Sequence, residues 1–347
     1  MITIKEIAAQ LDMSPTTVSN VIHGKTREVS KDTIERVNRF LEQVDYIPNI
    51  NARNLAQNQS KIIGVVLKTE ESRHTYANIL ADPFVSEMLG GIESRVSDSG
   101  YFVMLYISDD INKIIHQVST WNVDGLVLFW MMDDDALKVS RKFHKPIVSI
   151  DTYLGDEAAA KMGEFFVNIG LEDEKGVYEG VSYLISRGHK KIGFLTDSDM
   201  GVDKERYKGY LKALEDGGIE YSEDNYFHLK TTTDEIEGSL LELAEKCRGF
   251  DAVFCCSDIF GLMLMSACAR KGIRVPEDVS ILGFDDNLNS RLSYPALTTI
   301  HQDISKKGEL AADTLLSMVK GKKPESQQII LGTSIVERES VSDLTKN

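Results

Sequence analysis

Apolar positions along the chain follow two different periods, which divide it into a short helical head and a long body. From Thr3 to Val44 they recur every three or four residues, the spacing of amphipathic helices. From residue 61 onward, short apolar runs alternate with helical patterns, which indicates parallel sheets covered by helices on both faces. The expected strands are 62–67, 102–107, 125–131, 146–150, 191–196, 251–256 and 279–284, and the expected helices are 84–98, 110–120, 173–187, 203–216, 234–247, 257–271 and 303–320.

Three capped helices are expected in the head. Thr3 and Glu6 have the spacing of a capping box, and Ser14 precedes Pro15, a residue that fits the first helical position. Ser30 caps the third helix. The apolar stripes are Ile4, Ile7, Ala8 and Leu11, then Val18, Val21 and Ile22, then Ile34, Val37, Leu41 and Val44. This pattern is typical of a helix-turn-helix module, which places its second helix in the major groove of DNA.

The outward face of the second helix carries small polar residues where a solvated face would carry charges. Thr16, Thr17, Ser19 and Asn20 lie on it. Asparagine bonds adenine bidentately, and threonine serves a phosphate or a thymine methyl group. The alternative interpretation is a small interaction domain or a helical lid.

A polar segment, residues 48–60, links the head to the body. Pro48 ends the third helix, and the residues that follow are polar apart from Ile50 and Leu55. A helix this short is marginal alone, so a flexible linker is the expectation for the free protein.

The body is expected to be α/β, with two doubly wound parallel-sheet lobes, because it has too many strands for one sheet. The run of elements divides near 160–165. Ligands of such sheets bind beyond the carboxyl ends of the strands, so the cleft between the lobes is the expected binding site.

Charge is distributed unevenly over the 347 residues, whose net charge is −15. Residues 1–60 carry seven basic and seven acidic side chains, so the body carries the whole negative charge. An acidic body repels DNA, so only the head is expected to approach it. Because the head is electrically neutral, its affinity for DNA should be modest, and dimerisation is expected to raise it. No signal peptide and no apolar run of the ~18 residues that span a bilayer are visible, so a cytoplasmic protein with no membrane contact is expected.

Catalytic and metal-binding motifs are missing from the sequence. Cys247, Cys255, Cys256 and Cys268 form no CxxC pair, and buried thiols are expected. Leu282-Gly283-Phe284 lacks the further glycines of a dinucleotide loop, and Asp133–Asp135 lack the spacing of a calcium loop. We therefore expect no catalytic residue, no metal and no cofactor.

The head resembles the LacI/GalR family of bacterial transcription regulators, and the resemblance extends nearly end to end. It is carried by Thr3-Ile4-Lys5-Glu6-Ile7-Ala8, Ser14-Pro15-Thr16-Thr17-Val18-Ser19, Tyr46-Ile47-Pro48-Asn49 and Ala52-Arg53-Asn54-Leu55. The resemblance implies base reading by Pro15, Thr16 and Asn20, and phosphate contacts by Ser14, Thr17 and Ser19. It also implies a hinge helix on DNA, in which Leu55 wedges into the minor groove and Arg53 lies on the backbone or groove floor.

The same resemblance implies a periplasmic-binding-protein-like body in which the chain crosses three times between the lobes. The expected domains are the head at 1–47, the hinge at 48–60 and the core at 61–347. Within the core, the first lobe takes about 61–162 and 288–326, and the second about 163–287 and 327–340. The function implied is a homodimeric repressor of carbohydrate-utilisation genes that binds a pseudo-palindromic double-stranded operator. A small effector, a sugar or sugar derivative, controls operator affinity through the setting of the lobes and hinges.

Effector contacts are expected where polar residues follow strands. Asp151, Asp258 and Asp285 follow expected strands, and Arg206 lies early in a helix. The family resemblance implies that these four residues contact the effector and that Phe84 forms an apolar wall. Carboxylates and a guanidinium read the hydroxyl groups of a sugar by bidentate hydrogen bonds. The alternative for each aspartate is a helix cap or a turn, and Asp286 is expected to cap a helix or face solvent.

Some residues depart from the family pattern, and other functions stay open. Glu172-Asp173, Ser257 and the long loop 69–81 differ from many relatives, and the loop is expected to border the cleft and alter the pocket. The alternatives are a regulator that responds to a nucleobase or a partner protein, a sugar-binding transport protein, and an enzyme.

Overall fold

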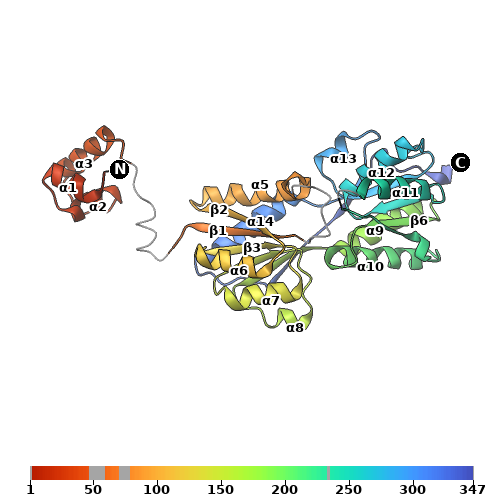
Figure 1. Cartoon of the computed structure of the whole chain (residues 1–347), viewed down its shortest axis with the longest axis horizontal. Coiled ribbons are helices and arrows are strands. Elements are labelled where there is room, and N and C mark those ends of the chain that lie inside the picture. The colour runs from red at the N-terminus through yellow and green to blue at the C-terminus, as the bar shows by residue number, and fades with distance from the viewer. Residues whose placement is uncertain (1, 47–58, 70–78, 233–234, 347) are drawn as a thin grey trace. The chain divides into compact units, whose positions relative to one another are not determined.

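The computed structural model describes residues 2–46, 59–69, 79–232 and 235–346, in two compact units, Met1–Ser60 and Lys61–Asn347 (Figure 1). The division falls where the helical spacing of the sequence gives way to the strand pattern. Arg53, Leu55 and most of the expected hinge lie outside the described residues.

The first unit contains the three expected helices, α1 (Ile4–Leu11), α2 (Pro15–Ile22) and α3 (Lys31–Gln43). Thr3 and Glu6 form the capping box, and the side chains of Ser14 and Ser30 accept hydrogen bonds from the backbone N–H groups of Thr17 and Thr33. The core of the unit consists of Ile7, Ala8, Val18, Val21 and Val37. The sequence pattern thus predicted these helices and their caps correctly.

The first lobe of the second unit is built on a six-stranded parallel sheet of order β11-β5-β4-β3-β1-β2. One apolar cluster unites its strands with α5 and α14, and another unites them with α6 and α7, so helices cover both faces (Figure 1). The strands are β1 (Ile62–Lys68), β2 (Phe102–Ser108), β3 (Gly125–Phe129), β4 (Ile147–Ile150), β5 (Phe166–Leu171) and β11 (Gln328–Leu331), and the helices are η1 (Ile79–Ala81), α5 (Pro83–Asp98), α6 (Ile111–Thr120), α7 (Asp133–Lys142), α8 (Asp156–Ala159) and α14 (Ile304–Val319).

The second lobe is built on another six-stranded sheet, of order β12-β10-β9-β8-β6-β7, in which only the pair β10–β12 is antiparallel. Its strands are β6 (Ile192–Thr196), β7 (Tyr226–His228), β8 (Ala252–Cys255), β9 (Ser280–Asp285), β10 (Thr298–His301) and β12 (Ser334–Val336), and its helices are α9 (Asp173–Ser186), α10 (Gly201–Asp216), η2 (Glu223–Asn225), α11 (Ile236–Cys247), α12 (Asp258–Arg270), α13 (Leu288–Leu292) and η3 (Leu344–Lys346).

The chain crosses between the two sheets three times, from β5 to α9, from β10 to α14 and from β11 to β12. The expected lobe boundaries need correction. Residues 166–171 belong to the first sheet rather than the second lobe, because β5 pairs with both β4 and β11. Residues 288–301 belong to the second lobe because β10 pairs with β9, and residues 328–331 belong to the first. Asn168 and Gly170 interrupt the apolar run of β5, which hid this strand from the pattern.

The last residues of the chain lie along the second lobe. Ser340 Oγ donates to the carbonyl of Ile281 at 2.5 Å, and the N–H of Leu344 donates to the carbonyl of Arg187 at 2.8 Å. The ring of His189 is buried here, 3.1 Å from the carbonyl of Ser342 through Nε2. Nε2 therefore donates, while Nδ1 is buried without a hydrogen-bond partner among the described residues.

Protonation of His189 is expected to destabilise the second lobe. Burial lowers the pKa of this ring below its ordinary value of 6.5, against the opposing effects of the Ser342 carbonyl and of Asp251. The unfolded chain then binds more protons than the folded chain, so stability falls as the pH falls through about 6.5. Thermal unfolding midpoints measured between about pH 7.5 and about pH 5.5 should fall less in His189→Gln than in wild type. His144→Gln, at an exposed histidine, is the control; equal slopes for wild type and His189→Gln would contradict the prediction.

Candidate functional site

The residues expected to contact DNA lie at the start and on the outer side of α2. Ser14, Pro15 and Thr16 are exposed, and Ser19 and Asn20 are partly exposed. The Ser14 and Thr17 hydroxyl groups lie 2.8 Å apart, and Ser14 also accepts from the Thr17 N–H at 3.0 Å. Both residues therefore have a capping role in the structure besides the expected phosphate contacts.

A cavity of about 660 Å³ opens where the carboxyl ends of strands from both lobes meet the amino ends of α5, α10 and α12. Of the residues expected to contact the effector, Phe84, Asp151, Arg206 and Asp285 line this cavity, and Asp258 does not. The other acidic side chains in its lining are Asp82, Asp134, Asp197, Asp199, Asp203 and Glu205.

Two aromatic rings form one wall of the cavity. Pro83 begins α5, and Asp82 caps it by accepting from the N–H of Phe84 at 2.9 Å. This cap fixes the start of the helix and directs the Phe84 ring against Trp130, which follows β3. The ring centroids lie 6.1 Å apart at an interplanar angle of 21°. Such a pair offers an apolar face to a ligand ring.

Arg206 projects from α10 and is buried against three partners. Nε donates to Asp173 Oδ1 at 2.7 Å, Nη1 donates to the carbonyl of Cys256, and the guanidinium lies 3.6 Å from the centroid of the Phe284 ring. Burial opposes the charge, but the carboxylates of Asp173 and Asp285 raise the arginine pKa above its ordinary value. The guanidinium is thus a fixed cation in the wall of the cavity.

Asp151 and Asp285 bring one buried carboxylate from each lobe. Asp151 follows β4 and lies 3.0 Å from Nζ of Lys307, and Asp285 ends β9 and accepts from Nε2 of Gln302 at 2.7 Å. Burial raises the pKa of both carboxyl groups, against the opposing effect of Lys307 on Asp151 and of Arg206 on Asp285. Both residues have positive φ, which turns the chain away from the sheet at these points.

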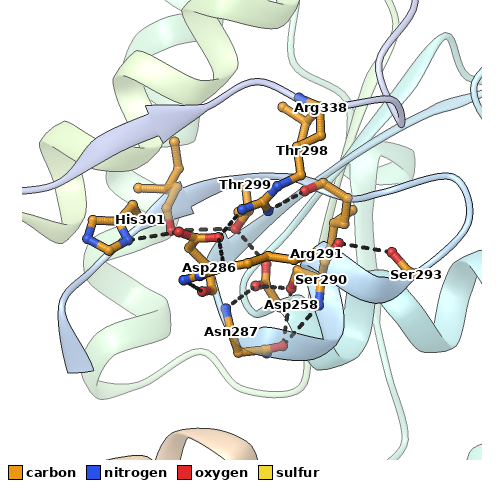
Figure 2. A network of polar contacts seen from close by, with 12 residues as sticks. Asp258, Asp286, Asn287, Ser290, Arg291, Ser293, Thr298, Thr299, His301 and Arg338 are labelled. Carbon is orange, nitrogen blue, oxygen red and sulfur yellow. Dashed lines mark hydrogen bonds and ion pairs between the residues drawn. The ribbon is translucent and has the colours of Figure 1, made fainter. Parts of the chain in front are cut away.

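Asp258 was expected to contact the effector, but its side chain does not line the cavity. Its side chain is fully buried and accepts from the N–H of Asn287 at 3.0 Å, from the hydroxyl of Thr299 at 2.5 Å and from the hydroxyl of Ser290 (Figure 2). These groups draw the carboxylate toward α13 and β10 instead of the cavity. Asp258 therefore joins the start of α12 to α13 and β10 by buried hydrogen bonds, which differs from both the expected effector contact and the alternative of a helix cap or a turn.

Asp286 also differs from expectation, since it neither caps a helix nor faces solvent. It is buried and pairs with Arg338, with Arg291 at 3.5 Å and with the ring of His301 at 3.0 Å (Figure 2). The partners come from α13, β10 and the segment after β12, so this carboxylate ties three elements of the second lobe together.

Sequence reasoning missed Trp130, Tyr153 and Gln302, which line the cavity, and Asp173 and Lys307, which hold Arg206 and Asp151 in its wall. Tyr153 follows the expected strand 146–150, so the strand-end signal that found Asp151 would also have found it. Trp130 lies inside the expected strand 125–131, and Gln302 follows β10, a strand that the sequence pattern did not predict. Asp173 begins α9 directly after β5, the strand that the sequence pattern did not predict, and Lys307 lies within α14. Lys307 is a charged residue on the buried face of α14, which the helical pattern treats as an apolar position.

The expectation of buried thiols is confirmed, since all four cysteines are free and buried. Among the described residues, no group of three or more histidine, cysteine, aspartate or glutamate side chains could hold a metal ion. No helix in the described ranges is long and apolar enough to cross a membrane.

Comparison with known proteins identifies the family. The family model for bacterial regulatory proteins of the lacI family matches residues 3–49, and the periplasmic binding protein-like domain matches residues 181–341. The HTH-type transcriptional repressor PurR of Mannheimia succiniciproducens is 32% identical over 99% of this chain and 100% of its own. The chain belongs to the lacI family. PurR of Serratia proteamaculans is 31% identical over 99% of this chain and 98% of its own.

Solved structures of lacI-family proteins have the same fold. A lac repressor dimer bound to operator and the anti-inducer ONPF superposes with a TM-score of 0.83 at 25% identity, over 98% of this chain and 99% of that one. The complex of the transcriptional regulator CelR with cellobiose has a TM-score of 0.70 at 26% identity, over 98% of this chain and all of the other. The chain is accordingly a DNA-binding transcription repressor and not an enzyme, and the expected two-lobed fold is confirmed.

Proposed function

We propose that this lacI-family repressor is controlled by a neutral, hydroxyl-rich ligand, a sugar or sugar derivative, bound in the cavity between the lobes. The observation that carries the proposal is the combination of Asp151, Asp285 and Arg206 with the Phe84–Trp130 wall. Carboxylates accept hydrogen bonds from sugar hydroxyl groups, and aromatic faces pack against the C–H groups of a sugar ring. The CelR relative, whose structure contains cellobiose, supports this class of ligand.

A nucleobase is the second candidate, because the relatives that are 31–32% identical carry the repressor name PurR. A purine would stack on the same aromatic wall and donate N–H groups to the same carboxylates. The cavity of about 660 Å³ has room for a ligand of either class, so binding measurements must decide between them.

Calorimetric titration of the full chain separates the two candidates. Cellobiose, D-ribose, hypoxanthine and guanine are the probes, and we expect heat of binding from a sugar. The footprint of the protein on its own promoter should then change when that sugar is added. Binding of a purine alone would overturn the sugar assignment and establish the second candidate.

We also propose that the repressor binds its operator as a homodimer. Leu288, Leu292 and Tyr294 are 63%, 73% and 96% exposed, and they lie together on α13 and the residues after it. Exposed apolar side chains of this size are typical of an interface. The occupant is a second copy of the chain, since the lac repressor matched over nearly its full length is a dimer on its operator. Two copies related by a two-fold axis fit a pseudo-palindromic operator.

DNA recognition is proposed to rest on Pro15, Thr16 and Asn20 for bases and on Ser14, Thr17 and Ser19 for phosphates. Their position at the exposed start and side of a capped helix supports this assignment. The hinge residues Arg53 and Leu55 are proposed to bind the minor groove, with the effector controlling whether the paired hinges form.

Leu55→Ala is expected to weaken operator binding on the order of 10- to 100-fold, because the variant loses the apolar wedge between base pairs. Affinity for the effector should not change. A mobility-shift titration on the promoter fragment measures the first effect, and calorimetry the second. Equal operator affinity for the variant and wild type would remove the wedge from the mechanism.

A further inference from the structure

Lys307 is a wholly buried lysine in α14. Burial of an ammonium group is unfavourable unless its donors are paired. Its Nζ donates to Asp151 Oδ1 at 3.0 Å, to Asp151 Oδ2 at 3.1 Å and to Gln302 Oε1 at 2.9 Å. These three contacts match the three N–H groups of the ammonium, which leaves no donor for a ligand.

The lysine also determines which way the amide of Gln302 points. An ammonium only donates, so the amide oxygen of Gln302 must face Lys307. The amide nitrogen then faces Asp285, whose Oδ1 accepts from it at 2.7 Å. A continuous path of hydrogen bonds therefore runs from Asp151 through Lys307 and Gln302 to Asp285. We call these four residues the interlobe relay.

The relay joins the two sides of the cavity. Asp151 follows β4 of the first lobe, Asp285 ends β9 of the second, and Gln302 lies in the crossover from β10 to α14. Asp151, Gln302 and Asp285 line the cavity. Nζ of Lys307 lies 5.9 Å from the centroid of the Phe84 ring, so the lysine is close to the aromatic wall as well.

We propose that Lys307 is a positioning residue for ligand recognition, which couples the ligand-facing carboxylates of the two lobes and selects a ligand that donates hydrogen bonds to both. The inference rests on the proposed binding of the effector in this cavity. With the ammonium already saturated, the relay offers acceptors and no free cation at its two ends. The ligand that meets both ends of the relay is therefore a polyhydroxy or N–H-rich compound that donates hydrogen bonds to the two carboxylates.

The test compares Lys307→Met with Lys306→Met in the full chain. Lys306 is the neighbouring lysine of α14, exposed and paired with Glu309 at 3.0 Å, so its loss leaves the relay intact. Cellobiose, D-ribose, hypoxanthine, guanine and glucose 6-phosphate are titrated calorimetrically. The compound that binds wild type should bind Lys307→Met about tenfold more weakly, as expected for lost hydrogen bonds to a charged group, and Lys306→Met as wild type. Equal affinity of Lys307→Met and wild type would overturn the proposal.

A double variant separates positioning from a purely structural role. If Lys307 acts through Gln302, the variant Lys307→Met with Gln302→Leu should bind the compound no more weakly than the poorer single variant. Independent roles would make the two losses add, which would contradict the relay. Should Lys307→Met fail to fold, Lys307→Arg takes its place with the same expectations, because arginine keeps the charge beside Asp151 but changes the donor geometry at Gln302.

The pH profile is a second readout that a structural role would not change. Burial raises the pKa of the Asp151 carboxyl group, and the positive charge of Lys307 opposes this rise. The charge of Asp173 also raises the pKa of Asp151, and that of Arg206 lowers it. Without Lys307 the carboxyl group takes up a proton at higher pH and stops accepting at one oxygen. Binding to Lys307→Met should therefore weaken as the pH falls toward 6, more steeply than binding to wild type. Parallel profiles would count against the proposal.

Failure of the proposed ligand class is distinguishable from failure of the relay. If none of the five compounds binds wild type, the proposed ligand class is wrong. The relay is then tested by unfolding measurements, which need no ligand. Urea unfolding of Lys307→Met, Asp285→Asn and their double variant then gives the changes in the free energy of unfolding. These changes should be non-additive in the wild-type background and additive in the Gln302→Leu background. Additive effects in both backgrounds would overturn the relay, since contact through Gln302 is what couples the two residues.

Discussion

Arg206→Ala is expected to lower the free energy of unfolding of the core by about 3–5 kcal/mol, because it removes the cation that pairs with the buried carboxylate of Asp173 and leaves only the Tyr153 hydroxyl to donate to it. The guanidinium also contacts the carbonyl of Cys256 and the ring of Phe284, so the start of α10 loses its connection to β8 and β9. Since Arg206 lines the cavity, the response of operator binding to the effector should disappear in the same variant. Urea unfolding measures the first effect, and a mobility shift with and without effector the second.

A surface arginine and a paired apolar replacement are the controls for this prediction. Arg270 is 56% exposed and pairs with Glu237, and Arg270→Ala should change stability by less than about 1 kcal/mol. Arg206→Met combined with Asp173→Leu removes both charges and should recover part of the lost stability, while the effector response stays absent. If Arg206→Ala responds to the effector as wild type does, Arg206 has no role in effector recognition.

Leu292→Glu is expected to convert the proposed dimer to a monomer. Operator affinity should then fall on the order of 10²- to 10⁴-fold, because a monomer loses the gain in affinity that comes from binding two half-sites at once. Leu292 is 73% exposed on α13, so a charge there leaves the isolated chain folded and prevents burial against a second copy. Light scattering measures the oligomeric state, and a mobility-shift titration measures operator affinity.

Trp121→Glu is the matched control, because Trp121 is a large apolar residue that is 57% exposed on the first lobe, after α6. It should keep the oligomeric state and operator affinity of wild type. A dimeric Leu292→Glu variant with undiminished operator binding would exclude the α13 surface as the interface.

Local chemistry explains which elements could be predicted. The capping box of Thr3 and Glu6 and the cap of Ser14 followed by Pro15 are interactions within three residues, so the sequence contains both partners. Long apolar runs such as 62–67 also predict their strands, because a strand buried on both faces has no polar alternation. β5 was missed because Asn168 interrupts it, and its side chain is satisfied by Ser149 and Gln328, which lie on the neighbouring strands.

The candidate site was predictable only as far as strand ends reveal it. Asp151 and Asp285 follow strands and line the cavity, and Asp258 follows a strand yet turns toward Ser290 and Thr299. The sequence pattern is the same for all three. Their difference depends on which hydroxyl and N–H groups the fold brings within reach of each carboxylate.

The sequence by itself determined the helical head with its polar outer face, the alternation of strands and helices in the body, and the resemblance that assigns the chain to a family of repressors. Periodicity and capping are local, so these features need no knowledge of distant residues. Only the tertiary structure decided how the chain divides between the lobes and which charges pair. Lys307 and Asp151 are 156 residues apart in sequence, and only the packing of α14 beside β4 places an ammonium group against that carboxylate.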